Sequence, residues 1–168
     1  MAEVMLGGIP IRLHSGAPEP EHNPIGGSTV ARRSGGAAVK MQHWRRWAIT
    51  IRGVGWMGPG LMGLDFSQPL ELRCIRQQSL TTTALTGTIP GTPRPDEEPW
   101  CLAYVGGDWK LTPVDVEPDK SFSITAVPGA LEYKVCWLPV FMVFSEPPVE
   151  SLDPATNTHT WTITAEEI

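Results

Sequence analysis

The sequence predicts an all-β protein, with a sandwich or barrel-like antiparallel body, an extended N-terminal arm and long loops rich in glycine and proline. Three observations predict this class. Several segments alternate apolar and polar residues at the two-residue period of a half-buried strand. No segment places apolar residues at helical spacing over three turns. Glycine and proline number 17 each among 168 residues, and this content disfavours long helices.

The beginning of the chain is predicted to be an arm. Residues 1–36 contain one short β-prone piece, Ile9 to Leu13, among many glycines and prolines. Such a segment cannot bury enough side chain to hold itself in place, so it is either mobile or ordered against another subunit. We therefore expect an arm at 1–36 followed by a single β-domain at 37–168.

The strands of the first part follow from β-branched and aromatic content and from alternation. A turn containing five glycines, Gly53 to Gly63, separates two of them. The expected segments are Ala38 to Met41, Trp47 to Arg52, Leu70 to Cys74 and Thr81 to Leu85. Residues 86–99 are rich in proline and are expected to form a loop that projects from the body.

The second part repeats the β pattern. Two expected strands flank the turn Gly106-Gly107-Asp108 and predict a hairpin. A further strand precedes the Pro128-Gly129 turn, and Leu131, Tyr133, Val135 and Trp137 then share one face of the next strand. The expected segments are Trp100 to Val105, Trp109 to Val114, Ser121 to Val127, Leu131 to Trp137, Phe141 to Phe144 and His159 to Thr164.

Charge is distributed unevenly along a chain whose net charge is −5. Residues 1–79 hold nine Lys/Arg against five Asp/Glu, and residues 80–168 hold four against thirteen. A basic and an acidic end allow copies of the chain to pair head to tail. The alternative is a solvated surface of scattered charges. The sequence pI of 5.3 runs against binding to phosphate backbones, so nucleic acid is not expected as a partner.

Membrane, secretory and metal-binding classes are not indicated. The N-terminus has no basic segment followed by an apolar core. The longest apolar run, Val135 to Phe144, is about half of what a membrane helix needs, so we expect a soluble protein. The three cysteines have no CxxC spacing and predict buried thiols in a reducing compartment, with one disulfide as the alternative. We expect no metal and no cofactor.

Enzyme signals are also weak, and we expect that the protein is not an enzyme. The pattern Gly53-x-Gly55-x-x-Gly58 matches a dinucleotide-binding fingerprint, but Pro59 and Gly60 follow where a helix must begin. It therefore indicates a glycine-rich loop. The four histidines are scattered, and no nucleophile motif accompanies them.

Tryptophan and arginine, which are enriched at interface hot spots, suggest a subunit contact in His43-Trp44-Arg45-Arg46-Trp47. Contact with nucleic acid is the alternative for this cluster. The seven tryptophans also fit carbohydrate binding by ring stacking, although Trp137 and Trp161 are expected in the core. The candidate subunit interface is His43, Trp44, Arg45, Arg46, Trp47, Trp56, Ile9, Ile11 and Leu13.

Three stretches resemble small structural proteins from the tail and baseplate of tailed bacteriophages. They run from Met5 to Ala17, from Pro24 to Val30 and from Gly55 to Cys74, so the resemblance covers about residues 5–75. It implies a virion tail subunit, made in the cytoplasm of a bacterial host. Its partners would be copies of itself and other tail or baseplate proteins, and it would bridge the tail tube to its neighbours. Alternatives are a carbohydrate- or receptor-binding virion module, a neck protein at the head-tail junction and an unrelated cellular β-sandwich.

Overall fold

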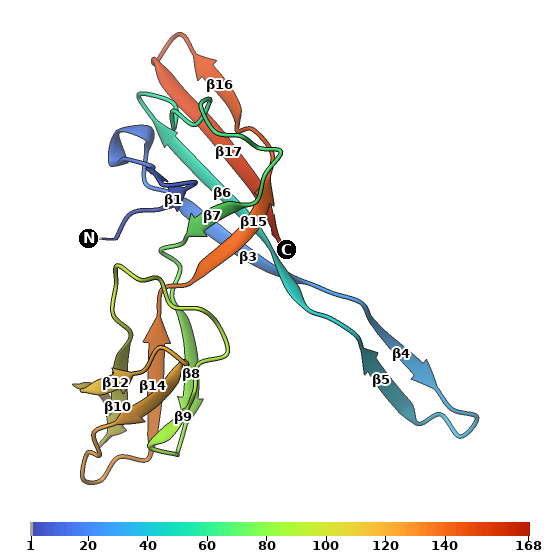
Figure 1. The fold of residues 1–168 in the computed structure, drawn as a ribbon, viewed down its shortest axis with the longest axis vertical. Helices are drawn as coiled ribbons and strands as arrows, with labels where there is room; N and C mark the ends of the chain where they lie inside the picture. Colours follow the sequence, from blue (N-terminus) through green and yellow to red (C-terminus); the bar gives the residue numbers. More distant parts are fainter. Residues whose placement is uncertain (1) are drawn as a thin grey trace. The chain divides into compact units, whose positions relative to one another are not determined.

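The computed structural model describes residues 2–168, and the fold is all β, as predicted (Figure 1). The only helical element among these residues is one short 3₁₀ turn, and no helix in them is long and apolar enough to cross a membrane. The elements are β1 (Met5–Leu6), β2 (Ile9–Pro10), η1 (Leu13–Ser15), β3 (Glu19–Ile25), β4 (Ser28–Arg32), β5 (Ala38–Gln42), β6 (Arg46–Gly55), β7 (Leu70–Arg73), β8 (Gln78–Thr82), β9 (Thr86–Thr88), β10 (Trp100–Val105), β11 (Asp108–Thr112), β12 (Val114–Val116), β13 (Ser121–Ile124), β14 (Glu132–Trp137), β15 (Val140–Ser145), β16 (Val149–Asp153) and β17 (Thr158–Glu167).

The chain forms two compact units. Unit 1 comprises residues 2–5 and Leu72–Phe141, and unit 2 comprises Leu6–Glu71 and Met142–Ile168. The expected boundary at residue 36 coincides with neither limit, because β3 and β4 lie before it and pair with β6 and β5 after it. The expected arm therefore contributes one side of a long hairpin within unit 2.

Unit 1 packs two antiparallel sheets around one core. The strand orders are β11-β10-β14-β8 and β12-β13-β9. The first sheet contributes Cys101, Ala103, Tyr133, Val135 and Trp137 to the core, and β13 contributes Phe122 and Ile124. Alternate residues of each strand point inward, so the two-residue period read from the sequence has a direct structural cause.

The predicted hairpin of unit 1 is confirmed as β10 and β11, which pair from Cys101 opposite Thr112 to Val105 opposite Asp108. Gly106 and Gly107 form the turn with φ values of 61° and 87°. Two consecutive residues with positive φ match the twist of the flanking strands, and glycine adopts this conformation without steric cost.

The segments around Pro128-Gly129 form strands, but they do not pair with each other. β13 pairs with β12 and β9, whereas β14 pairs with β10 and β8. The turn thus carries the chain from one sheet of unit 1 to the other. Leu131, which was expected on the inner face, is 72% exposed because the strand begins only at Glu132.

Residues 86–99, expected as a projecting loop, pack within unit 1. The first three residues form β9, which pairs with β13. Ile89 is 1% exposed and Arg94 is 2% exposed. The backbone N–H of Ile89 donates to the carbonyl of Lys120 at 2.9 Å. The proline-rich segment is therefore a packed loop and does not project from the body.

The largest sheet has the order β2-β1-β7-β15-β17-β6-β3, with β16 also pairing with β17. Its long strands β6 and β17 pair from Ala48 opposite Glu166 to Gly55 opposite His159. Ile49, Ile51, Trp161 and Ile163 are each at most 1% exposed. These side chains form the centre of the core of unit 2.

The glycine pattern at residues 53–58 serves packing. Gly53 and Gly55 lie in β6 and not in a loop before a helix. A Cβ at Gly53 would overlap the ring of Trp161, and one at Gly55 would overlap the backbone at Ser15 and Gly16. The indole N–H of Trp161 donates to the Ser15 carbonyl at 2.6 Å. Glycine is therefore required here so that η1 and Trp161 can approach the strand.

All three cysteines are buried free thiols, as predicted. Burial raises the pKa of Cys74 to about 12 and that of Cys101 to about 11, and it also raises the pKa of Cys136. Because the thiolate is the reactive form, these side chains behave as small apolar core residues.

Candidate assembly interface

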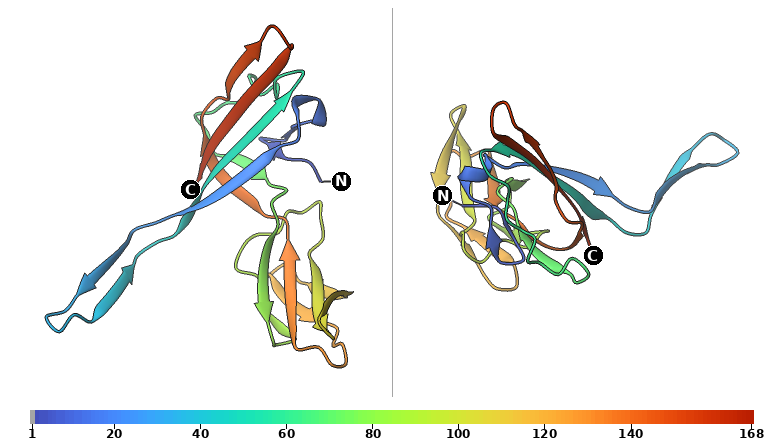
Figure 2. Two further views of the ribbon diagram at one scale, coloured as in Figure 1. Left: turned by 180° about the vertical axis from the view of Figure 1, so that it is seen from behind. Right: turned by 90° about the horizontal axis from the view of Figure 1, so that it is seen from above.

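A two-stranded ribbon extends from unit 2 (Figures 1 and 2). Residues 26–45, which we call the ribbon, contain β4 and β5 as a sheet of their own. The strands pair from Ser28 opposite Gln42 to Arg32 opposite Ala38. At the tip, the N–H of Arg33 donates to the Ala37 carbonyl at 3.0 Å. The ribbon continues the hairpin that β3 forms with β6.

Both faces of the ribbon are open. Every residue of β4 is exposed, and in β5 only Val39 is half-buried. Because side chains alternate along a strand, the register places Thr29, Ala31, Val39 and Met41 on one face. Val30, Arg32 and Lys40 lie on the other. One face is therefore largely apolar, the opposite one carries cations, and nothing in unit 2 covers either.

A bulge joins the ribbon to its base. Gly26 and Gly27 lie opposite three residues, His43, Trp44 and Arg45, so these three lie outside the regular strand pairing. The N–H of His43 donates to the Gly27 carbonyl at 2.9 Å. A Cβ at Gly27 would lie 2.8 Å from the Trp44 indole nitrogen. The indole therefore lies close over a glycine backbone and remains 51% exposed. Bulges of this kind redirect a strand pair.

Arg46 and Trp47 fasten the base of the ribbon to the C-terminal strand. The Arg46 Nε donates to the carbonyl of Ile168 at 2.7 Å. The backbone N–H of Trp47 donates to a carboxylate oxygen of Glu167 at 3.1 Å. The guanidinium of Arg45 lies 5.1 Å from the centre of the Trp47 ring, within cation-π range. Arg46 and Trp47 therefore make contacts within the subunit, and Trp44 is exposed.

The remaining candidate interface residues lie near η1. Trp56 is 58% exposed and Leu13 is 65% exposed. The His14 ring meets Trp56 edge-on at 5.5 Å. Ile9 is half-buried, and Ile11 is 2% exposed. Ile11 is therefore a core residue and offers no contact surface, which corrects its place in the predicted interface. The predicted set divides between the base of the ribbon and the η1 region.

The charge of the ribbon is the feature that comparison of sequence halves missed. The ribbon holds Arg32, Arg33, Lys40 and Arg45, and the chain has no Asp or Glu between Glu21 and Asp65. Among the described residues, no acidic side chain pairs with Arg32, Arg33 or Lys40. A scan for acid-free runs would have located this segment.

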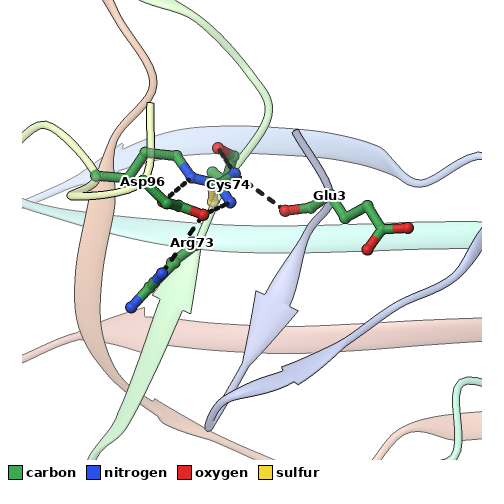
Figure 3. Close-up of polar contacts among 5 residues, drawn as sticks. Glu3, Arg73, Cys74 and Asp96 are labelled. Carbon is green, nitrogen blue, oxygen red and sulfur yellow. Dashed lines mark hydrogen bonds and ion pairs between the residues drawn. The ribbon is translucent and has the colours of Figure 1, made fainter. Parts of the chain in front are cut away.

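Unit 1 contains a buried charged cluster (Figure 3). The side chain of Arg94 is 1% exposed. It donates to both carboxylate oxygens of Asp96 at 2.8 and 2.7 Å, and to the carbonyls of Glu3 and Cys74 at 3.0 and 3.2 Å. Arg73 lies 3.4 Å from the same carboxylate. These bonds join three separate segments of unit 1.

In the Arg94 cluster the carboxylate of Asp96 is held by two arginines. The hydrogen bonds from Arg94 are the largest of the effects that hold the pKa of Asp96 well below its usual range. A carboxylate held in this way is a poor proton acceptor at neutral pH. Among residues 2–168, no three His, Cys, Asp or Glu side chains gather as metal ligands.

The outer face of the sheet β11-β10-β14-β8 carries an aromatic patch. Trp100, Leu102 and Tyr104 alternate with buried Cys101 and Ala103 along β10. The Tyr104 ring lies 5.0 Å from the ring of Trp109, and the Lys134 Nζ lies 4.5 Å above that ring. Leu111 on the same face is 74% exposed. This patch is a second candidate contact surface.

Comparison with known proteins adds no relative to these observations. No protein-family model matches the chain, and no curated protein matches its sequence. The geometry of the ribbon and the sequence pattern therefore carry the functional argument.

Proposed function

We propose that this protein is a structural subunit of a bacteriophage tail or baseplate that assembles in several copies and bridges the tail tube to neighbouring tail-end proteins. The ribbon is its assembly device. The proposal has two supports, which are independent of each other.

The first and principal support is the exposure of the ribbon. An isolated two-stranded hairpin is marginally stable in water. Val30 and Met41 are 58% and 45% exposed, and Trp44 at the base is 51% exposed. Covering these side chains would stabilise both the ribbon and the complex. A ribbon with this composition is suited to a partner protein.

The second support is the sequence resemblance to phage tail and baseplate proteins over residues 5–75. Residues 26–30 of the ribbon lie in one of the three segments that carry this resemblance. A role without catalysis agrees with the chemistry of the perturbed groups, since Asp96 is held by Arg94 and the three thiols are buried.

The test is a shortened variant in which residues 27–44 are replaced by a two-residue Asn-Gly turn. Ile25 and Arg46 already pair across the hairpin, so the turn closes a register that exists. The variant should fold with native near-UV circular dichroism and fail to enter phage particles. Particles are purified, probed with an antibody against the chain and imaged with gold label. Label on wild-type particles at the tail end supports the baseplate position, and label at the neck supports the head-tail junction.

A matched control replaces the unit 1 turn Gly106-Gly107 with Asn-Gly, which keeps the hairpin type. This control should enter particles normally. Normal incorporation of the variant that lacks the ribbon would overturn the proposed role of the ribbon.

The aromatic patch favours one alternative, a carbohydrate- or receptor-binding virion module. Sugar faces stack on aromatic rings, and the half-buried rings of Trp109 and Tyr104 lie together on the outer face of this sheet. Titration of bacterial cell-wall oligosaccharides, followed by tryptophan fluorescence, tests it. A response that Trp109→Ala abolishes and Trp44→Ala retains would favour this function.

A further inference from the structure

Unit 2 carries an acidic edge in addition to its basic ribbon. From residue 135 to the C-terminus the chain holds five acids, Glu146, Glu150, Asp153, Glu166 and Glu167, and no Lys or Arg. Three of them lie in or beside β16. We call residues 146–153 the acidic edge. The basic ribbon of one copy of unit 2 is therefore complementary in charge to the acidic edge of another copy.

β16 is an edge strand. It pairs with β17 along one side, from Val149 opposite Thr162 to Asp153 opposite Thr158, and the strand order gives it no second neighbour among the described residues. All five of its residues are exposed, including Val149 at 75% and Leu152 at 51%. An edge of this kind presents unpaired backbone groups to a further strand.

The two surfaces match in length as well as in charge. β4, β5 and β16 each contain five residues, and both strands of the ribbon have an open outer side because they form a sheet of their own. Strand addition supplies affinity through main-chain hydrogen bonds. Arg32, Arg33 and Lys40 on one side and Glu146 and Glu150 on the other would set partner choice and orientation.

The strand order separates the two surfaces within one copy. The ribbon continues β3 and β6, and β16 lies beyond β17 on the other side of β6. A subunit that donates a strand at one side of its sheet and accepts one at the other makes a heterologous contact. Such contacts close into a ring or continue as a filament.

We propose that the ribbon of one copy adds to the acidic edge of a second copy and aligns its cations with Glu146 and Glu150. This inference rests on the proposed function and names the partner of the ribbon. A second copy is favoured over nucleic acid because four cations on a chain of net charge −5 give a weak phosphate footprint, and because an apolar face accompanies the cations.

The test uses two charge-reversal variants of the full chain. The ribbon variant is Arg32→Glu with Arg33→Glu and Lys40→Glu, and the edge variant is Glu146→Lys with Glu150→Lys. Sedimentation velocity at several protein concentrations and two salt concentrations measures self-association. Wild-type association should weaken with salt, and each variant should weaken it at least about tenfold. Mixing the two variants should restore association, because each ribbon then meets an edge of opposite charge.

Two control variants show whether the effect depends on where the charge is changed or only on the net charge of the chain. Lys110→Glu and Asp115→Lys change exposed charges in unit 1 and should leave association unchanged. The inference fails if the wild type remains monomeric at every concentration, if the edge variant associates like the wild type, or if mixing gives no recovery. Ribbon-dependent binding of duplex DNA by a monomeric chain also overturns it.

Failure of the inference differs from failure of the proposed function. If the edge variant enters particles and the variant without the ribbon does not, the ribbon is an assembly device that binds another protein. If both enter particles, the proposed role of the ribbon as the assembly device fails as well.

Discussion

Two hairpins of the same chain differ in what covers them. The β10–β11 hairpin of unit 1 pairs further with β14 and buries Cys101 and Ala103 in a core. The ribbon has equally good pairing but leaves every residue of β4 exposed. Main-chain pairing alone contributes little net stability, since it replaces hydrogen bonds to water. The first hairpin is therefore complete within the subunit, whereas the ribbon has the composition of a segment that needs a partner.

The largest test of this contrast compares two tryptophans. Trp137→Ala removes a side chain that is 2% exposed from the core of unit 1 and should destabilise that unit by about 3–5 kcal/mol. Trp44→Ala at the ribbon should change the stability of the isolated subunit by less than about 0.5 kcal/mol. Urea unfolding followed by circular dichroism measures both. Similar losses would mean that the ribbon is integral to the core.

A smaller effect is expected for two arginines. Arg94→Met removes donors from Asp96 and from the carbonyls of Glu3 and Cys74 and should cost about 2 kcal/mol. Arg33→Met in the ribbon should cost less than about 0.5 kcal/mol. The same unfolding experiment compares them.

The pH dependence of the Arg94 variant supplies its control. The folded-state pKa of Asp96 lies below its ordinary value of 3.8. The wild type therefore gains stability above that value and loses it as the pH falls toward the folded pKa. Arg94→Met should flatten this loss, and an unchanged acid profile would contradict the role assigned to the pair.

Two turn glycines, one in each hairpin, allow a comparison between closely matched sites. Gly107 and Gly36 have φ values of 87° and 80°, and a Cβ at either would meet nothing within 4 Å. Alanine at each therefore tests backbone conformation alone, and the left-handed conformation costs alanine about 1 kcal/mol. Gly107→Ala should lower the stability of unit 1 by this amount. Gly36→Ala should leave global unfolding unchanged and accelerate hydrogen exchange only in the ribbon. Equal global effects would remove the distinction between the two hairpins.

The smallest effect at neutral pH concerns the buried thiols. Burial raises the folded pKa of Cys74 from 9.0 to about 12. Its stabilising contribution is complete below pH 9 and is lost as the pH rises toward 12, because the unfolded chain releases the proton first. Urea midpoints from pH 7 to 10 should fall, and less so in Cys74→Ala. A thiol placed in the ribbon by Ser34→Cys should react at once with a thiol reagent, while the three native thiols react only on unfolding.

Local features of the fold could be predicted because they depend on neighbouring residues. The alternation in Tyr133, Val135 and Trp137 and the turn chemistry of Gly106-Gly107 lie within a few positions of each other. Pairing between strands that are not joined by a tight hairpin turn could not be predicted, as β13 and β14 demonstrate. Both strands alternate well, but the pattern does not say that they belong to opposite sheets.

The candidate site was predictable in part. The His43 to Trp47 cluster marked the base of the ribbon, but the ribbon itself was assigned partly to an arm, because alternating exposure cannot be recognised without knowing which strand lies opposite. Ile11 is an apolar residue in a short β-prone segment, and such a residue is expected to contact a partner when the segment is taken alone. Its burial depends on the sheet that surrounds it.

By itself, the sequence determined the all-β class, the positions of several strands, the burial of the cysteines and the absence of acids from residues 22–64. These properties depend on composition and on periods of two residues. Tertiary structure alone decided the two units, the open ribbon and the burial of Arg94. The carbonyls that hold Arg94 belong to residues 91 and 20 positions away, and contacts over such separations depend on how sheets pack.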